Sequence, residues 1–326
     1  MAHDTEHSRS ESRSFLTLPD LGREKFVDLL ALSSQLKLEM KQRDKLDYLA
    51  GKLIALLFET PSTRTRVSFE AASLRMGADV MYLQSDRLKI AGGEPADDTG
   101  RVLSGYCDCL VARVWPHDTL IRLASRSTVP VINACTDVDH PTQALCDLFT
   151  VQEALGPLNG LRMVFVGTGN NMCNALMFGC ALAGMSLTIA CPAGLEPAED
   201  VLMTAQRLAR ESGGSVRIDH DPAEAIRNAD VVYTDIWEVP GREDLDITEV
   251  NVDWSRYRVD RSLLALAPEG IRVMHCGDAL RGKEITDEVM TGPESLIWDQ
   301  ADNKLFGGAA VLFYALTGET LLPTPQ

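Results

Sequence analysis

Side chains able to bind an anion are gathered in one short segment, Ser-Thr-Arg-Thr-Arg at residues 62–66. Arginine pairs with phosphate through two parallel N–H groups, and serine and threonine hydroxyls donate to the remaining oxygens. The first turn of a helix adds free backbone N–H groups and the positive end of the helix dipole. If a helix begins here, these residue types at this spacing predict a phosphate site.

The flanking residues predict that helix. The apolar run Leu53 to Phe58 is typical of a buried strand, Pro61 interrupts it, and Ser62 is a favoured helix cap. Three apolar side chains of the helix are expected to face a core: Val67, Ala71 and Leu74. A capped surface helix with solvated or ion-paired arginines would show the same pattern, so these residues alone leave both interpretations open.

The composition narrows the class of protein. The 326 residues are 45% hydrophobic and 24% charged, as in globular proteins, and suffice for two domains. The net charge of -16 argues against nucleic acid or an anionic membrane as a partner, and no apolar run reaches the roughly 18 residues of a membrane span. Residues 1–14 are polar, which predicts a disordered tail rather than a secretory signal.

Neither the cysteines nor the glycines indicate a cofactor. The eight cysteines form no Cys-x-x-Cys pair, so we expect free thiols in a reducing cytoplasm and no metal site. The glycine motif at residues 167–171 follows a predicted strand, as in dinucleotide-binding proteins. However, Met172 replaces the third glycine and the next strand ends in Ala-Cys-Pro without an acid, which disfavours a nicotinamide cofactor.

Strand-like and helix-like segments alternate along the chain. Strands are predicted at residues 53–58, 79–83, 109–114, 129–134, 161–166, 186–191, 215–218, 231–234 and 272–276, and helices at 16–41, 101–106, 119–125, 141–155 and 305–316. Residues 84–99 are predicted to be a functional loop. The alternation predicts an α/β fold of two Rossmann-like doubly wound parallel-sheet domains joined by helices, with ligands at the carboxyl ends of the strands. Turn residues at 156–160 favour domains at 15–150 and 151–304, with helix 305–320 packing back on the first.

Two further polar side chains fall near such strand ends. Arg113 ends a predicted strand, where a buried cation needs an anionic partner. His140 opens the predicted helix 141–155, where its ring is able to donate to a carbonyl oxygen. A structural ion pair and a helix cap would also account for these two residues, and the residues alone leave their roles open.

Taken in order, the motifs resemble the aspartate/ornithine carbamoyltransferase family from about residue 15 to 315. The shared motifs are Ser-Thr-Arg-Thr-Arg followed by Phe69-Glu70, His140-Pro141-Thr142-Gln143, the aspartate of Asp235-Ile236-Trp237, and His275-Cys276. The resemblance implies that residues 15–150 bind carbamoyl phosphate and residues 151–304 bind an amine acceptor. It also implies a homotrimer, or a multiple of one, with shared sites, in which Arg87 or Lys89 reaches a neighbouring subunit.

The resemblance also assigns roles to single residues. Those expected to bind carbamoyl phosphate are Ser62, Thr63, Arg64, Thr65, Arg113, His140 and Gln143. Those expected to take part in catalysis are Arg64, Thr65, Arg113, His140, Gln143 and Cys276. His140 would donate to the carbonyl oxygen and Gln143 would contact the carbamoyl amide, while Arg66 would brace the loop. Those expected to meet the acceptor are Asn171, Asp235, Val239, Cys276, Gly277, Asp278 and Lys304.

Departures from the family pattern cluster on the acceptor side. Val239 lies where the pattern has a Ser-Met-Gly motif, Gly277-Asp278 replaces Leu-Pro, and Lys304 replaces an arginine. A site that loses hydrogen-bond donors discriminates against the ligand that needed them. We therefore expect carbamoyl transfer to a primary amine of an ornithine-like or larger acceptor, as in antibiotic tailoring, giving a ureido product and phosphate. Two alternatives stay open: transfer to ornithine itself, giving citrulline, and a non-catalytic paralogue that only binds carbamoyl phosphate.

Overall fold

The computed structural model describes residues 13–84, 88–238 and 250–323. The strands are β1 (Leu53–Phe58), β2 (Asp79–Gln84), β3 (Cys109–Arg113), β4 (Val131–Cys135), β5 (Arg162–Val166), β6 (Ser186–Ala190), β7 (Ser215–Asp219), β8 (Val231–Thr234) and β9 (Arg272–His275). The longer helices are α2 (Arg23–Gln42), α3 (Thr63–Arg75), α4 (Ala96–Leu103), α5 (His117–Arg126), α6 (Pro141–Leu155), α7 (Asn171–Ala183), α8 (Glu199–Ser212) and α12 (Ile297–Thr317). The short ones are α1 (Leu18–Leu21), α9 (Pro222–Ala225), α10 (Arg261–Leu264), α11 (Asp287–Met290) and the 3-10 turns η2 (Lys89–Gly92), η3 (Ile226–Asn228) and η4 (Trp254–Tyr257).

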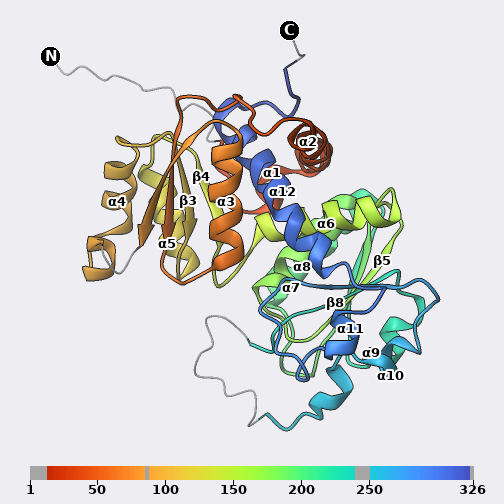
Figure 1. The fold of residues 1–326 in the computed structure, drawn as a ribbon. Coiled ribbons are helices and arrows are strands. Elements are labelled where there is room, and N and C mark those ends of the chain that lie inside the picture. The colour runs from red at the N-terminus through yellow and green to blue at the C-terminus, as the bar shows by residue number, and fades with distance from the viewer. Residues whose placement is uncertain (1–12, 85–87, 239–249, 324–326) are drawn as a thin grey trace, which may run out of the picture.

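The strands form two separate sheets, which confirms the predicted α/β class (Figure 1). The order is β2-β1-β3-β4 in the first sheet and β7-β6-β5-β8-β9 in the second. Every pairing within the two sheets is parallel, so each sheet has all its carboxyl ends at one edge. In the first sheet Phe58 pairs with Arg113, which places one polar residue at this edge, and in the second Thr234 pairs with His275, which places two polar residues side by side.

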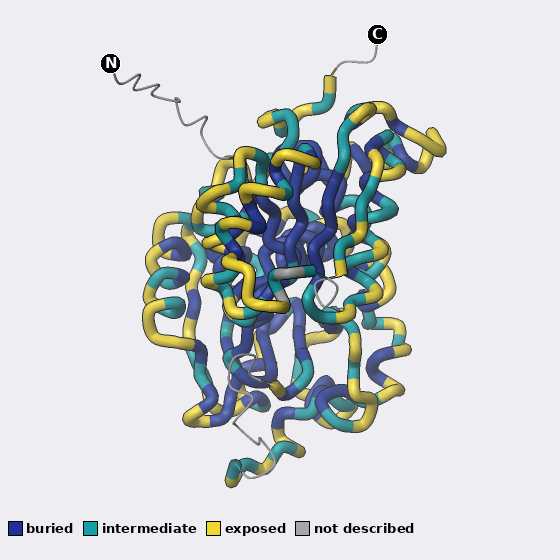
Figure 2. Tube along the Cα trace, turned by 90° about the vertical axis from the view of Figure 1, so that its left-hand side faces the viewer, coloured by how far each residue is buried: buried dark blue, intermediate teal, exposed yellow. Residues whose placement is uncertain are grey.

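Two helices join the halves of the molecule. Helix α6 leads from the first sheet to the second, and α12 packs against α2, α3 and α6 (Figure 1). The central strands lie in the buried interior of each half, whereas the outer strands β2 and β7 are mostly half-buried or exposed (Figure 2). The side chains of α6 from Pro141 to Val151 are all buried, as expected for a helix with neighbours on every side.

The predicted core face of α3 is wrong. Val67 and Leu74 are 45% and 52% exposed, whereas Phe69 and Ala72 are buried. The reason is the position of α12, because α3 packs against that helix and the ring of Phe69 lies next to Gly308. The buried face of α3 is therefore set by a neighbour more than 200 residues away in the sequence, which local periodicity does not reveal.

Three predicted boundaries also differ from the structure. The opening helix is broken at Gly22, whose φ of 77° is a left-handed conformation that favours glycine. Helix α4 begins at Ala96 and so takes in the end of the predicted loop, and α12 begins at Ile297, eight residues before the predicted start. The predicted tail falls almost entirely on residues 1–12, which lie outside the described part of the chain.

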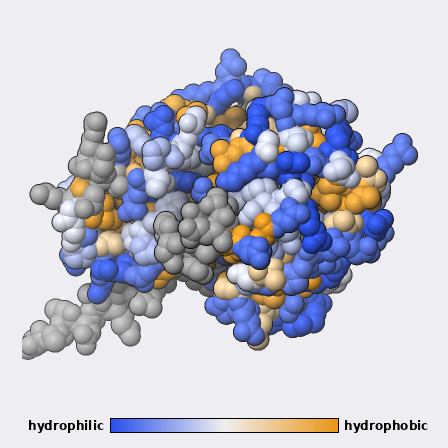
Figure 3. All heavy atoms as spheres, turned by 90° about the horizontal axis from the view of Figure 1, so that it is seen from below, coloured by the Kyte–Doolittle hydropathy of each residue, from blue (hydrophilic) through white to orange (hydrophobic). Residues whose placement is uncertain are grey.

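Within residues 13–84, 88–238 and 250–323, no helix combines the length and the hydropathy that a bilayer crossing requires. The face seen from below is mostly hydrophilic, with small separate hydrophobic patches (Figure 3).

Candidate active site

The predicted phosphate segment lies at the junction of β1 and α3. Ser62 is the cap residue of α3, yet its side chain makes no capping hydrogen bond, so the hydroxyl is not used within the helix. Thr65 is buried in the first turn, and Arg64 is half-buried beside it. The first-turn N–H groups of a helix have no acceptor within the helix, so the junction offers backbone donors together with hydroxyl and guanidinium groups.

Arg66, the second arginine of the segment, contacts the side chains of Tyr82 and Glu70. The guanidinium of Arg66 lies 4.8 Å from the ring centroid of Tyr82 on β2, and its Nη1 is 3.9 Å from a carboxylate oxygen of Glu70. These contacts hold α3 against the edge strand of the first sheet. Arg66 is thus engaged with side chains of α3 and β2, and its expected role in bracing the loop stays a prediction.

Arg113 reaches the same junction from the neighbouring strand. Its Nε donates to Thr60 Oγ1 at 2.9 Å, and its guanidinium lies 5.2 Å from the ring centroid of Trp115. No carboxylate within ion-pair distance of Arg113 is found among the described residues. Its positive charge is therefore available to an anion at the junction.

The charges of three cations act on His140, the cap residue of α6. Burial lowers the pKa of His140 well below its ordinary value, and the positive charges of Lys304, Arg113 and Arg64 lower it further. The imidazole is consequently neutral at physiological pH. A neutral imidazole has one N–H, which is able to donate to a carbonyl oxygen without bringing another charge into this cationic site.

A buried network fixes the orientation of Gln143. Its Nε2 donates to Asp147 Oδ1 at 2.6 Å, so its Oε1 points the other way and accepts from Lys304 Nζ. Asp147 also accepts from Gln300 at 2.7 Å and from the Tyr233 hydroxyl at 2.8 Å. Burial raises the pKa of Asp147 to about 6, although the three hydrogen bonds oppose this rise.

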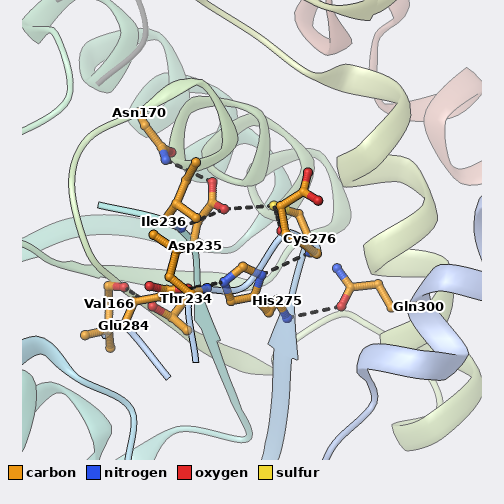
Figure 4. Close-up of polar contacts among 12 residues, drawn as sticks. Val166, Asn170, Thr234, Asp235, Ile236, His275, Cys276, Glu284 and Gln300 are labelled. Atoms are coloured by element: carbon orange, nitrogen blue, oxygen red, sulfur yellow. Dashed lines mark hydrogen bonds and ion pairs between the residues drawn. The ribbon is translucent and has the colours of Figure 1, made fainter. Parts of the chain in front are cut away.

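Asp235 and Cys276 meet at the carboxyl ends of β8 and β9 (Figure 4). The Cys276 thiol donates to Asp235 Oδ1 at 2.9 Å, and the amide of Asn170 donates to the other oxygen at 2.9 Å. Burial raises the pKa of both acidic groups. The pair places a carboxylate and a sulfur atom at the edge of the second sheet, as expected for contact with an amine.

His275, which precedes Cys276, makes hydrogen bonds to Gly277 and Glu284. The Gly277 N–H donates to His275 Nδ1 at 3.0 Å, so the ring proton lies on Nε2 and is donated to Glu284 at 3.2 Å (Figure 4). Both side chains of the His275–Glu284 pair are completely buried. The pair therefore anchors the turn that follows β9 rather than facing a ligand.

The turn after β9 contacts the donor side of the site. Asp278 Oδ2 lies 2.5 Å from Arg64 Nη2, and this ion pair joins the two halves of the chain. A cavity of about 130 Å³ lies between them, with walls that include Arg64, Gln143, Cys276 and Lys304. Two donor-side candidates, Arg64 and Gln143, thus line one small cavity with four acceptor-side candidates, which are Cys276, Gly277, Asp278 and Lys304.

Of the two acceptor-side candidates still to be placed, Asn171 lies within the described residues and Val239 does not. Asn171 donates from its Nδ2 to the backbone oxygen of Thr136 at 2.7 Å, so its amide is engaged in linking the two halves. Val239 and Arg87 lie outside the described residues, and Lys89 lies in the short turn η2. The acceptor contact expected of Asn171 stays a prediction.

The glycine motif after β5 has a packing role. A Cβ on Gly169 would lie 2.1 Å from the backbone nitrogen of Pro197, so only glycine allows this approach. Asn170 caps α7 by accepting from the Cys173 N–H at 2.9 Å.

One group of side chains within the described residues has the proximity needed for a metal ion: Asp235, His275 and Cys276. Their potential ligand atoms are already joined to Asn170, Glu284, Gly277 and one another by hydrogen bonds. The cluster is thus explained without an ion, and the absence of a metal stays a prediction.

Several residues of the site escape the sequence analysis. They are Asp147, Asn170, Tyr233, Glu284 and Gln300. One signal was present, because Asp147 follows Gln143 by four residues in a predicted helix and so shares its face. The contacts of the others join separate elements, and no local pattern marks them.

Comparison with known proteins agrees with this geometry. Residues 13–153 match the domain described as "Aspartate/ornithine carbamoyltransferase, carbamoyl-P binding domain", and residues 159–315 match "Aspartate/ornithine carbamoyltransferase, Asp/Orn binding domain". The chain is 46% identical over 291 residues to an ornithine carbamoyltransferase of Methanothermobacter thermautotrophicus, covering 89% of this chain and 95% of the relative.

Solved structures show the same relationship. The ornithine carbamoyltransferase of Pyrococcus furiosus is 40% identical, with a TM-score of 0.88, covering 94% of this chain and 97% of that one. The enzyme of Gloeobacter violaceus is also 40% identical, with a TM-score of 0.82, covering 94% and 99%. Together with the Arg64, Gln143 and Cys276 side chains around one cavity, these matches show that the chain belongs to the aspartate/ornithine carbamoyltransferase family and is a carbamoyltransferase.

Proposed function

We propose that the enzyme transfers the carbamoyl group of carbamoyl phosphate to the side-chain amine of ornithine, giving citrulline and phosphate. The observation that carries the proposal is that Arg64, Gln143 and Lys304 line one cavity together with Cys276. The charges of Arg64, Arg113 and Lys304 also act on His140 and keep its imidazole neutral. Relatives that are 40–46% identical over 89% or more of the chain are named ornithine carbamoyltransferases, which favours ornithine over the larger acceptor expected from the sequence.

The proposed donor site positions both reacting parts of carbamoyl phosphate. Ser62, Thr63, the first-turn N–H groups of α3 and the guanidinium groups of Arg64 and Arg113 would hold the phosphate. The His140 N–H, with Arg64 and Thr65 nearby, would stabilise the negative charge that develops on the carbonyl oxygen. Because the Gln143 Nε2 donates to Asp147, its Oε1 is the atom that faces away from Asp147 and now accepts from Lys304. When the donor binds, this Oε1 would accept from the carbamoyl amide in place of Lys304.

The reaction then follows from positioning and charge. The neutral amine of the acceptor attacks the carbonyl carbon, the bond from that carbon to the phosphate oxygen breaks, and the departing phosphate takes the proton lost by the amine. Asp235 and Cys276 would hold the acceptor amine at the edge of the second sheet, where they lie 2.9 Å apart. No covalent nucleophile is needed because the donor already carries its leaving group.

A second candidate keeps this donor and changes the acceptor. It is favoured by Asp278, which puts a carboxylate where the family pattern has an apolar pair and which lines the wall of the cavity. Such a carboxylate would suit an acceptor with a further cationic group.

One assay separates the candidates. The purified enzyme is incubated with carbamoyl phosphate and, separately, ornithine, lysine and a panel of diamines, and ureido products are identified by mass spectrometry. We expect citrulline with the highest kcat/KM. A ureido product from another amine, without citrulline, would favour the second candidate, and no transfer to any amine despite donor binding would refute both.

We also propose that the enzyme is a homotrimer or a multiple of one, as the family resemblance implies. The exposure of Val67 (45%) and Leu74 (52%) on α3, and of Tyr82 (39%) on β2, supports an interface there, since exposed apolar side chains are typical of contact surfaces. Light scattering should give a multiple of three chains, and Leu74→Glu should lower the mass. A monomeric wild-type enzyme would refute the proposal.

A further inference from the structure

A carboxylate of the second half occupies an arginine of the proposed donor site. Asp278, in the turn after β9, has its Oδ2 2.5 Å from Nη2 of Arg64, in the first turn of α3. The Asp278 side chain is 79% exposed, so neither a core contact nor burial forces it into this place. The pairing with Arg64 also holds the pKa of Asp278 below its ordinary value.

The backbone of the turn is shaped for this approach. Gly277 and Asp278 have φ values of 100° and 60°, so two consecutive residues adopt conformations that most side chains avoid. A Cβ on Gly277 would lie 2.3 Å from Nε of Arg64, so a side chain at this position would displace the guanidinium. Aspartate tolerates the left-handed conformation better than most residues. The turn thus combines a glycine that admits the arginine with an acid that can pair with it.

The carboxylate and a donor phosphate compete for the same N–H groups. Arginine pairs with carboxylate and phosphate oxygens through the same planar fork, and an N–H directed at Asp278 is not directed at a phosphate. We propose that Asp278 determines donor affinity by occupying Arg64 as an internal stand-in for the phosphate, which carbamoyl phosphate must displace. The inference rests on the proposed role of Arg64 in donor binding.

Replacing Asp278 by asparagine tests this competition directly. The substitution keeps the side-chain size and a tolerance for the left-handed backbone but removes the charge. The probe is phosphonoacetamide, in which a methylene replaces the bridging oxygen of carbamoyl phosphate, and its binding to the full chain is measured by calorimetry. Because a largely exposed ion pair makes a small contribution, we expect D278N to bind the probe about two- to fivefold more tightly, with the difference shrinking at high salt.

A matched control separates competition from a general charge effect. Asp302 lines a surface groove together with Arg64, is exposed, and forms no ion pair among residues 13–84, 88–238 and 250–323. D302N therefore removes one negative charge near the same arginine without freeing it, and we expect its affinity for the probe to stay at the wild-type value. Thermal unfolding of each variant checks that the fold is retained.

The possible outcomes are distinct. If D278N and D302N bound the probe more tightly by the same factor, the proposal would be overturned. The loss of any negative charge near Arg64 would then explain the effect. Unchanged or weaker binding in D278N would also overturn it, and weaker binding would show that Asp278 braces the site. If neither the wild type nor D278N bound the probe, the proposed donor site itself would fail together with the inference.

Discussion

Asp147→Asn removes a buried charge while keeping the shape of the side chain. Asp147 is completely buried and accepts hydrogen bonds from Gln143, Gln300 and Tyr233. Burial raises its pKa from 3.8 to about 6. The protonated carboxyl is therefore favoured in the folded chain relative to the unfolded chain.

The sign of the effect follows from proton binding. Between pH 3.8 and about 6 the folded chain binds more protons at Asp147 than the unfolded chain does, so stability falls as the pH rises through this window. At about 1.4 kcal/mol for each pKa unit, the loss is about 3 kcal/mol and is complete above pH 6. Asparagine does not titrate. The free energy of unfolding of D147N, relative to that of the wild type, should therefore rise by about 3 kcal/mol between pH 4 and pH 7.

Urea unfolding at pH 4, 5, 6 and 7, at one protein concentration, measures this difference. The two proteins share all other titrating groups, so the pH dependence of the difference between their unfolding free energies reports the titration of Asp147. Parallel stability profiles would refute the reasoning, because they would mean that Asp147 titrates equally in the folded and unfolded chains. Since Asp147 orients Gln143, D147N should also lower kcat at pH 7 with little change in the affinity for phosphonoacetamide.

Two further predictions concern the reacting groups. His140→Ala should lower kcat by about 100-fold or more while leaving the affinity for phosphonoacetamide nearly unchanged, since it removes a donor to the developing oxyanion; an unchanged kcat would exclude this role. Because the pKa of His140 lies well below 6.5, wild-type kcat should show no loss attributable to this residue as the pH falls from 8 to 6.5. Cys276→Ala should raise the KM for ornithine about fivefold, the value of a single hydrogen bond of about 1 kcal/mol, and an equal loss of donor affinity would contradict its placement on the acceptor side.

The sequence alone predicts the sheets well because their signal is local. The apolar run Leu53 to Phe58 coincides with β1, and the helix predicted at residues 141–155 is found as α6. The prediction of the buried face of α3 fails because Phe69 packs against α12, a distant partner in the sequence. Local periodicity carries no information about such a partner.

In the candidate site, too, local sequence signals reveal some residues but not the contacts between distant elements. Residue types and strand ends indicate Arg64, Arg113, His140 and Asp235 as candidates, and in the structure the charges of the two arginines act on His140. The pairing of Asp278 with Arg64 depends on the relative position of the two halves and on a left-handed turn. A carboxylate in the sequence does not disclose which cation it meets.

The affinity of Arg64→Ala for phosphonoacetamide tests the central claim most directly, because the account places the donor phosphate on this side chain at the start of α3. Hydrogen bonds to charged groups contribute about 1.5–3 kcal/mol, so binding should weaken by about tenfold to 100-fold. Arg66→Ala, two residues on in the same helix, removes an arginine engaged with Tyr82 and Glu70 and should retain wild-type affinity. Wild-type affinity in Arg64→Ala, or equal losses in the two variants, would contradict the account.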